Sequence, residues 1–422
     1  MKKLLIILST ILLVGCSNLQ VDVKKAEDKN IIENVELTKK FKNVIVFIGD
    51  GMGPNHVDAG GVYLGKPLCF DVTNEDWVYH AYSNTDSLTS QGFTLDETKS
   101  LLRPELNPSL YDGTPSPYDP NVSLGASGNI TTYTDSAAGG TALATGKKVT
   151  NSRIGMDVNG NPIENLVEIA ASLGKKTGVV TSDVLVGATP SSFMVHVGER
   201  HMEDEIVRSI PLSPVDLVLS QKPGIFTENQ TEYESLYKQN GFSIAYNREQ
   251  LDSEANRQLG LFDLVASKPD PRVPTLEELT SYALDYLDNE EGFFLMVEGS
   301  NIDKKSHSNE TKLMMNELLG FNDAVEAATE WASAREDTLI VVTADHETGG
   351  LYYDREIATQ DNIIESICWK TMNHSRTRVD IAVYGDISEY VTKYADNFKT
   401  LEGIPYWDNT DVFRLCSTYL MG

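Results

Sequence analysis

The chain contains 422 residues, of which 41% are hydrophobic and 23% are charged. This composition is typical of a globular protein with a large core and excludes an intrinsically disordered chain. The formal net charge of −27 excludes a nucleic-acid partner bound through a basic surface. The same charge repels phosphate esters, so a phosphate site in this chain requires local positive charge from arginine or bound metal ions.

The first residues have the layout of a secretory signal. Two lysines precede an apolar run over residues 4–14, which is too short to span a bilayer. The run ends in LVGC at 13–16, which resembles a bacterial lipobox, where cleavage precedes a cysteine that becomes lipidated. We expect a signal peptide over 1–15, lipidated Cys16, and a polar tether over 16–42. The protein would then be secreted across the cytoplasmic membrane and lipid-anchored at the cell envelope, in the periplasm or on the outer surface. The alternative is an ordinary secretion signal with an incidental cysteine.

Three apolar runs end at polar residues. Residues 44–48 are followed by Asp50, residues 293–297 by Glu298, and residues 339–343 by the pair Asp345-His346. Continuous apolar runs are typical of strands buried on both faces, as in parallel sheets covered by helices. Ligands bind beyond the carboxyl ends of such strands, where these acidic residues fall.

Helical patterns alternate with these strands. Residues 164–173 and 311–334 each place apolar side chains on one face. The alternation predicts an α/β fold, with a single catalytic domain over 43–422. Two mixed, polar segments near 66–132 and 202–274 do not fit the alternation. We interpret both as insertions that cap the site or form the contact of a homodimer.

Ser136 begins a run of small residues, Ser136-Ala-Ala-Gly-Gly, that is typical of a closely packed helix. A helix N-terminus places backbone N–H groups and partial positive charge on an incoming phosphate. A serine attacks only when a base or a metal lowers its pKa, and no histidine lies near Ser136 in the sequence. A metal is therefore the expected activator. The alternative is that Ser136 only caps the helix.

Several residue types suit metal ions and phosphate. Asp303 and His307 are four residues apart at a predicted helix start, so they share one face and can bind one metal. Asp345 and His346 are adjacent in the sequence, so both side chains can reach one ion only if the chain forms a turn there. Arg200 offers two parallel hydrogen bonds to phosphate oxygens. For any of these residues in isolation, a surface salt bridge or a capping role is the alternative.

Five sequence blocks, in order, resemble the alkaline phosphatase family. They are VIVFIGDGMG at 44–53, TDSAAGGTALATGKK at 134–148, GATPSSFMVHVGER at 187–200, MVEGSNIDKKSH at 296–307 and VVTADHETGG at 341–350. The resemblance implies a three-layer α/β/α fold with a large, mostly parallel central sheet. It implies an enzyme that hydrolyses phosphate monoesters through a phosphoserine intermediate, with two zinc ions and one magnesium ion as cofactors.

The resemblance also implies a role for each site residue. Ser136 would be the nucleophile, Arg200 the phosphate clamp, and Lys304 a contact to phosphate through water. The implied metal ligands are Asp303, His307 and His374 for the first zinc, Asp345, His346 and Asp50 for the second, and Asp50, Glu298 and Thr189 for magnesium. Three divalent ions and Arg200 outweigh the four carboxylates, which leaves a net positive site for the phosphate dianion.

Two positions depart from the family pattern. Residue 187 is glycine where family members usually carry Asp or His near the magnesium, and the block around His374 lacks the usual His-Thr-Gly. Two rival interpretations remain. One is a phosphodiesterase or sulfatase of the wider superfamily, although the Pro- and Arg-containing sulfatase motif is absent around Ser136. The other is a non-catalytic lipoprotein that captures phosphate or metal, which would not need Ser136.

Overall fold

The computed structural model describes residues 37–87, 133–394 and 399–422, except 39, 72, 75, 76, 402 and 403. These residues belong to one compact unit, Asn34–Gly422. Cys16, the predicted signal peptide and residues 88–132 of the segment predicted as an insertion lie outside the described residues. Among the residues that are described, no helix combines the length and apolar character needed to cross a bilayer.

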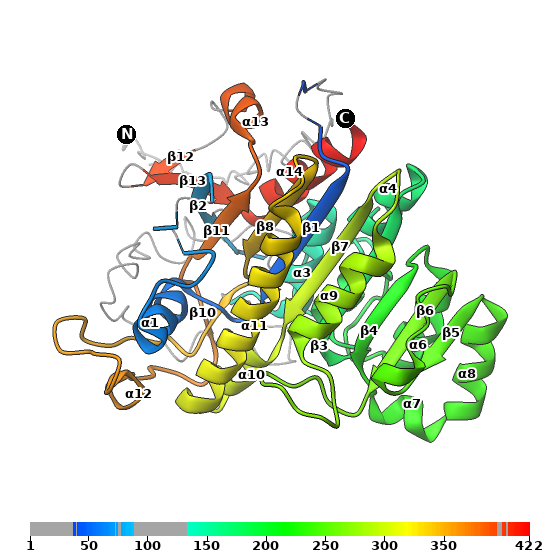
Figure 1. The fold of residues 1–422 in the computed structure, drawn as a ribbon, viewed down its shortest axis with the longest axis horizontal. Coiled ribbons are helices and arrows are strands. Elements are labelled where there is room, and N and C mark those ends of the chain that lie inside the picture. Colours follow the sequence, from blue (N-terminus) through cyan, green and yellow to red (C-terminus); the bar gives the residue numbers. More distant parts are fainter. Residues whose placement is uncertain are drawn as a thin grey trace, which may run out of the picture. The chain divides into compact units, whose positions relative to one another are not determined.

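The unit is built around one large sheet, which contains eleven strands in the described part of the chain (Figure 1). All neighbouring strands pair in parallel except at β11 and β12, which run antiparallel to their neighbours. In order across the sheet the strands are β12 (Lys399–Leu401), β13 (Ile404–Asp408), β2 (Tyr79–Asn84), β11 (Val379–Tyr384), β8 (Thr338–Thr343), β1 (Asn43–Gly49), β7 (Phe293–Gly299), β3 (Lys176–Val184), β4 (Leu217–Gln221), β6 (Arg257–Phe262) and β5 (Phe242–Ala245).

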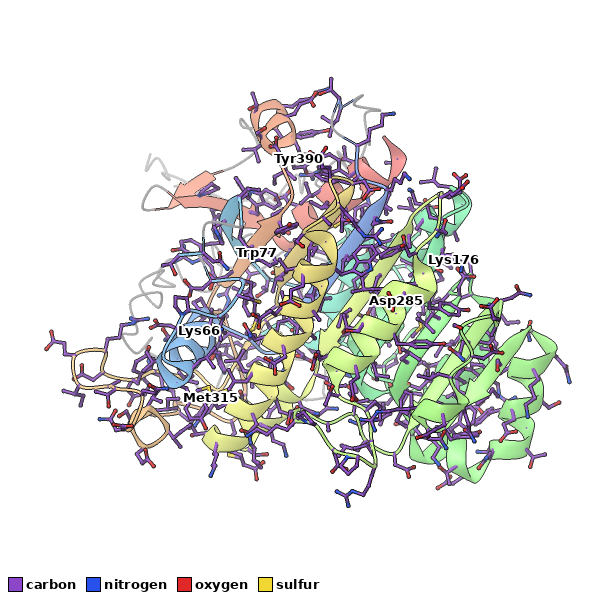
Figure 2. The ribbon with its side chains drawn as sticks, viewed as in Figure 1. Lys66, Trp77, Lys176, Asp285, Met315 and Tyr390 are labelled. Atoms are coloured by element: carbon purple, nitrogen blue, oxygen red, sulfur yellow. The ribbon has the colours of Figure 1, made fainter. Side chains whose placement is uncertain are left out.

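Helices cover both faces of the sheet. Side chains of β1 alternate between two hydrophobic clusters, with Val44 and Val46 in one and Ile45 and Phe47 in the other. The first cluster includes residues of α3 (Ser136–Thr145), α4 (Leu166–Ser172) and α14 (Asn409–Met421); the second includes residues of α1 (Pro54–Leu64), α9 (Leu276–Leu287) and α11 (Thr311–Ala332). Met315 of α11, labelled in Figure 2, belongs to this second cluster and is buried. The predicted three-layer α/β/α fold is confirmed.

The remaining elements are short. They are α5 (Ala188–Ser192), α6 (Glu203–Ser209), α7 (Gly224–Glu228), α8 (Gln230–Gln239), α10 (Asn301–His307), α12 (Ile363–Ser366), α13 (Ser388–Lys393), the 3-10 helices Ile210–Leu212 and Arg248–Gln250, and a two-stranded sheet of β9 (Glu347–Thr348) and β10 (His374–Ser375). Three of them, α5, α10 and β10, carry residues that the sequence singled out as metal ligands.

The segment 202–274 does not interrupt the α/β alternation, contrary to our expectation. It contributes β4, β6 and β5, which extend the sheet in parallel beyond β3. These strands have only four to six residues, and the helix α8 between them buries only Tyr233 and Tyr237. Short strands and a mostly solvated helix give weak hydrophobic periodicity, which is why the segment resembled an insertion.

The predicted tether also extends too far. Leu37 and Phe41 are 2% and 3% exposed and belong to a hydrophobic cluster of the domain. The ring of Phe41 packs edge-on against Tyr419 of α14 at a centroid distance of 4.7 Å. The Thr38 backbone N–H and hydroxyl both donate to Glu389. The end of the segment predicted as a tether is therefore part of the folded domain.

Candidate active site

Three buried carboxyl groups lie at the carboxyl ends of adjacent parallel strands. Asp50 follows β1, Glu298 lies near the end of β7 and Asp345 follows β8. In the sheet register Ile48 of β1 pairs with both Glu298 and Thr343, so the three strands end at one level. All three side chains are at most 5% exposed. The predicted convergence of these acidic residues at one sheet edge is confirmed.

Gly51 allows the chain to turn close to the site. Its φ is +73°, a conformation that favours glycine. A Cβ atom at this position would lie 2.8 Å from the Cα of Asp303. The Gly51 backbone N–H donates to Asp345 Oδ1 at 3.2 Å. This turn therefore brings Asp50, Asp303 and Asp345 together.

The first group of candidate ligands is Asp303, His307 and His374. The Nε2 atoms of His307 and His374 are 3.0 Å apart, and they lie 3.3 and 3.6 Å from Asp303 Oδ1. Asp303 and His307 occupy one face of α10, as the spacing predicts. His374 arrives from β10, which pairs antiparallel with β9 directly after His346. The structure thus brings His374 to a pair of residues that lies far from it in the sequence.

Backbone carbonyls fix the tautomers of two histidines in this group. The Nδ1 of His307 donates to the carbonyl of Met372 at 2.5 Å, and the Nδ1 of His374 donates to that of Thr134 at 2.6 Å. Because a carbonyl oxygen only accepts, the proton of each neutral imidazole lies on Nδ1. The Nε2 atom then carries a lone pair, which points toward the other histidine and toward Asp303. Two lone pairs and a carboxylate at these distances suit a bound cation, and a carbonyl partner on the other nitrogen is typical of metal-binding histidine.

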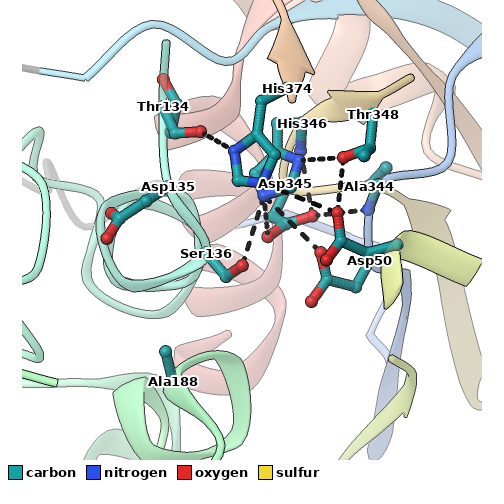
Figure 3. A network of polar contacts seen from close by, with 12 residues as sticks. Asp50, Thr134, Asp135, Ser136, Ala188, Ala344, Asp345, His346, Thr348 and His374 are labelled. Atoms are coloured by element: carbon teal, nitrogen blue, oxygen red, sulfur yellow. Dashed lines mark hydrogen bonds and ion pairs between the residues drawn. The ribbon is translucent and has the colours of Figure 1, made fainter. Parts of the chain in front are cut away.

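The second group surrounds the buried ring of His346. Its Nε2 lies 3.2 Å from Asp345 Oδ2 and 3.6 Å from Asp50 Oδ1. Ligand atoms of Asp50, Asp303 and His346 all lie within 4.8 Å of one another, so Asp303 adjoins both groups. The rings of His346 and His374 stack at a centroid distance of 3.6 Å, as Figure 3 shows.

Burial, together with repulsion between the carboxylates, favours the neutral forms of the side chains in the second group. Burial raises the pKa of Asp345 to about 7 and, with the charges of Asp345 and Asp303, raises the pKa of Asp50 well above its usual range. Burial lowers the pKa of the His346 imidazole. Oδ1 of Asp50 and Oδ2 of Asp345 are buried without a hydrogen-bond partner among the described residues. Such a donor set fits divalent cations, which favour the deprotonated ligands.

Ser136 faces this second group from the first turn of α3. Its Oγ lies 3.3 Å from His346 Nε2, and its side chain is buried (Figure 3). The helix cap is Asp135, whose Oδ1 accepts from the Ala138 N–H at 2.9 Å. The capping alternative for Ser136 is therefore wrong. A Cβ atom at Gly139 would lie 2.9 Å from Asp345 Cβ, so the small residues of α3 permit this close approach.

Arg200 lies beside the same helix. Its Nη1 donates to Asp135 Oδ2 at 3.3 Å, and its backbone N–H donates to the Ser152 carbonyl. Burial lowers the pKa of Arg200, but the charges of Asp135, Asp50 and Asp183 outweigh this effect and raise it. Arg200 therefore remains charged beside these acidic residues. Its ion pair is with Asp135, which the sequence reasoning missed although the residue adjoins Ser136.

Glu298 and Thr189, which are predicted to bind magnesium together with Asp50, are both buried. Burial, followed by the charge of Asp183, raises the pKa of Glu298 to about 8. Glu298 Oε2 accepts from the Thr181 hydroxyl. In the part of the chain that the structure describes, Glu298 Oε1 and the Oγ1 of Thr189 are buried without a partner. Buried, unpaired oxygen atoms are the ligands that a hard cation prefers, so this set fits magnesium.

Lys304 forms an ion pair with Asp183 at the end of β3. The sequence reasoning assigned Lys304 a contact to phosphate but gave no role to Asp183. The signal that would have found Asp183 is its position at the end of a buried strand, which also marks Asp50, Glu298 and Asp345.

The alkaline phosphatase family model matches residues 124–216 and 224–403. Alkaline phosphatase 4 of Bacillus subtilis (strain 168) is 32% identical over 323 residues, which are 74% of this chain but only 62% of that relative. Alkaline phosphatase 3 of the same strain is 30% identical over 371 residues, 83% of this chain and 70% of the relative.

A solved structure gives the same likeness. A mutant alkaline phosphatase of the Antarctic bacterium TAB5, with magnesium bound in its M3 site, matches with 26% identity and a TM-score of 0.67. The match covers 90% of this chain and 98% of that one. The family predicted from the sequence is confirmed: the chain belongs to the alkaline phosphatase family.

Proposed function

We propose that this protein hydrolyses phosphate monoesters through a phosphoserine formed on Ser136, at a site that holds two zinc ions and one magnesium ion. The observation that carries the proposal is the placement of the Ser136 hydroxyl, 3.3 Å from His346 Nε2 and at the N-terminus of α3. A site that only captured phosphate or metal would have no need of a hydroxyl at this point.

Three sets of side chains would hold the metals. Asp303, His307 and His374 suit one zinc, Asp50, Asp345 and His346 suit the other, and Asp50, Glu298 and Thr189 suit magnesium. When bound, the ions supply positive charge that lowers the pKa of the serine and stabilises the leaving oxygen. Family membership and the carbonyl-fixed histidine tautomers support this assignment.

The protein's own groups would act on a substrate in the following order. Ser136 Oγ gives up its proton to solvent and attacks phosphorus, so that an Oγ–P bond forms while the bond to the alcohol oxygen breaks in line with it. The alcohol leaves and takes up a proton. Water then attacks the phosphoserine, and Oγ departs and is reprotonated. Inorganic phosphate is the second product.

Arg200 and α3 would bind the phosphoryl oxygens during both steps. The guanidinium donates two hydrogen bonds, and the free N–H groups of the first helical turn add partial positive charge. Asp135 positions both the helix N-terminus and Arg200, because its Oδ1 caps α3 and its Oδ2 accepts a hydrogen bond from Arg200. The strongly acidic protein therefore presents substrate with a locally positive site.

Metal analysis and an activity assay test this function. Purified protein should contain two zinc ions and one magnesium ion per chain and should hydrolyse an aryl phosphate at alkaline pH. Chelation should abolish the activity, and zinc plus magnesium should restore it. An aryl phosphodiester and an aryl sulfate serve as controls and should react far more slowly. Full hydrolysis under strong chelation would overturn the metal scheme, and a faster diester reaction would overturn the substrate class.

The protein is further proposed to be attached to the membrane by lipid on Cys16 and to form a homodimer. The lipobox-like LVGC at 13–16 supports the anchor, and the attached lipid would place the site at the cell envelope. Replacing Cys16 with serine should release active enzyme from the membrane fraction into the soluble fraction, as measured by phosphatase assay of both. Retention of the variant in the membrane fraction would contradict the anchor.

A further inference from the structure

Asp183, near the end of β3, lies against Gly187. Residue 187 is glycine, where the family resemblance implies an acidic or imidazole side chain near the magnesium. In this structure the space is occupied by Asp183. A Cβ atom at Gly187 would lie 2.6 Å from Asp183 Oδ2 and 2.9 Å from its Cγ. The carboxylate of Asp183 thus stands where a side chain of residue 187 would begin.

An irregularity in β3 brings Asp183 to this place. The pairing of β3 with β4 shifts register between Val180 and Val184. Such irregularities bend a strand and redirect its side chains. The backbone N–H of Asp183 donates to Thr181 Oγ1 at 2.7 Å, and the Thr181 hydroxyl in turn donates to Glu298. Asp183 is therefore tied to a proposed magnesium ligand through one side chain.

Charge connects Asp183 to the same site. Its Oδ1 pairs with the Lys304 ammonium group, and its side chain is only 13% exposed. After burial, the charge of Asp183 is the main cause that raises the pKa of Glu298. Asp183 is thus close to Glu298 on one side and to Lys304 on the other. Lys304 directly follows Asp303 on α10.

We propose that Asp183 is a positioning residue of the magnesium site, in place of the side chain missing at residue 187. This inference rests on the proposed function. Asp183, Asp50 and Glu298 together carry three negative charges, which Lys304 and one divalent cation balance. Without the Asp183 carboxylate, the lysine would be unpaired beside the cation and would repel it. Asp183 therefore sets the affinity for magnesium by neutralising and holding Lys304.

A simpler role for Asp183 is to close the turn after β3, because its Oδ1 also accepts from the Val184 N–H at 2.6 Å. Asparagine at position 183 separates the two roles. Its side-chain oxygen keeps the hydrogen bond of the turn, but the residue loses the charge that pairs with Lys304. A role in the turn alone predicts unchanged magnesium binding in Asp183→Asn.

The test is calorimetric titration of magnesium into zinc-loaded protein from which magnesium has been removed. Asp183→Asn should weaken magnesium binding by at least about tenfold, as is typical when a partner of metal ligands is removed. Its zinc content and melting temperature should match the wild type. Asp288→Asn is the matched control, because it removes an ion pair with Arg335 that lies outside the site. It should bind magnesium like the wild type.

Moving the carboxylate from residue 183 to residue 187 tests directly whether Asp183 takes the place of a side chain at residue 187. Asp183→Gly alone should weaken magnesium binding, and adding Gly187→Asp to it should recover most of the affinity, because the carboxylate returns at a position whose φ of −52° suits any residue. Equal affinity in the wild type and Asp183→Asn, or no recovery in the exchange variant, overturns the inference alone. A wild type that binds no magnesium overturns the three-metal scheme together with this inference.

Discussion

Replacing Ser136 with alanine is expected to lower kcat for an aryl phosphate by at least about 10³-fold, which corresponds to about 4 kcal/mol of activation free energy. The variant loses the hydroxyl oxygen that lies 3.3 Å from His346 Nε2. Without it, phosphoryl transfer must pass directly to water. The fold should survive, because the helix cap is Asp135 and alanine matches the small neighbours in α3. Steady-state kinetics measure kcat, and the mass of acid-quenched protein shows whether a phosphoryl group is attached to the chain.

Arg200→Ala is the matched comparison for this experiment. It removes the proposed clamp but leaves Ser136 and both histidine groups in place, so the acid-quenched protein should still show the added mass of one phosphoryl group. Loss of charged hydrogen bonds to phosphate should lower kcat/KM by about 10- to 100-fold, chiefly through KM. A phosphorylated peptide that excludes Ser136, or full turnover by Ser136→Ala, would contradict the covalent route.

The sequence predicted the acidic part of the site because a simple rule governs it. Strands of a parallel sheet end at one edge, so the residues after three buried apolar runs must meet there. The position of Asp303 and His307 likewise follows from helical periodicity. His374 has no such local signal. It reaches the site through β10, which pairs with β9 over only two residues. Only the family resemblance identified it.

Other features depend on contacts that local patterns do not encode. The position of Asp183 at the end of a buried strand is visible in the sequence, but its approach to Gly187 is not, because there the pairing of β3 with β4 shifts by two residues. The short strands β4, β5 and β6 are stabilised by the neighbouring strand rather than by their own periodicity. Leu37 and Phe41 lie in a polar segment, yet they belong to a core cluster that includes residues of α14, among them Tyr419, against which Phe41 packs. Each of these errors comes from tertiary packing that overrides local sequence.

The metal-free protein is expected to lose stability as the pH rises from about 4 to about 8. Burial raises the pKa of Asp345 from 3.8 to about 7 and that of Glu298 from 4.5 to about 8. Between the unfolded and folded pKa values, the folded state binds more protons than the unfolded state. The stabilising contribution of these two carboxyl groups is therefore full below pH 4 and is lost as the pH rises through their folded pKa values. The shift of Asp345 alone corresponds to about 4 kcal/mol.

Bound cations should remove this loss, because they compensate the charge of the deprotonated ligands. Thermal melting of chelated and metal-loaded protein at a series of pH values measures the difference between the two forms. Glu347 is buried near the site, has a pKa raised to about 7 and is not a proposed ligand, so it contributes to both forms and cancels in the difference. Glu298→Gln should flatten the pH dependence of the chelated form above pH 5. If the chelated protein instead melts at the same temperature from pH 5 to pH 8, the buried carboxyl groups do not require cations, and the electrostatic basis of the metal site is wrong.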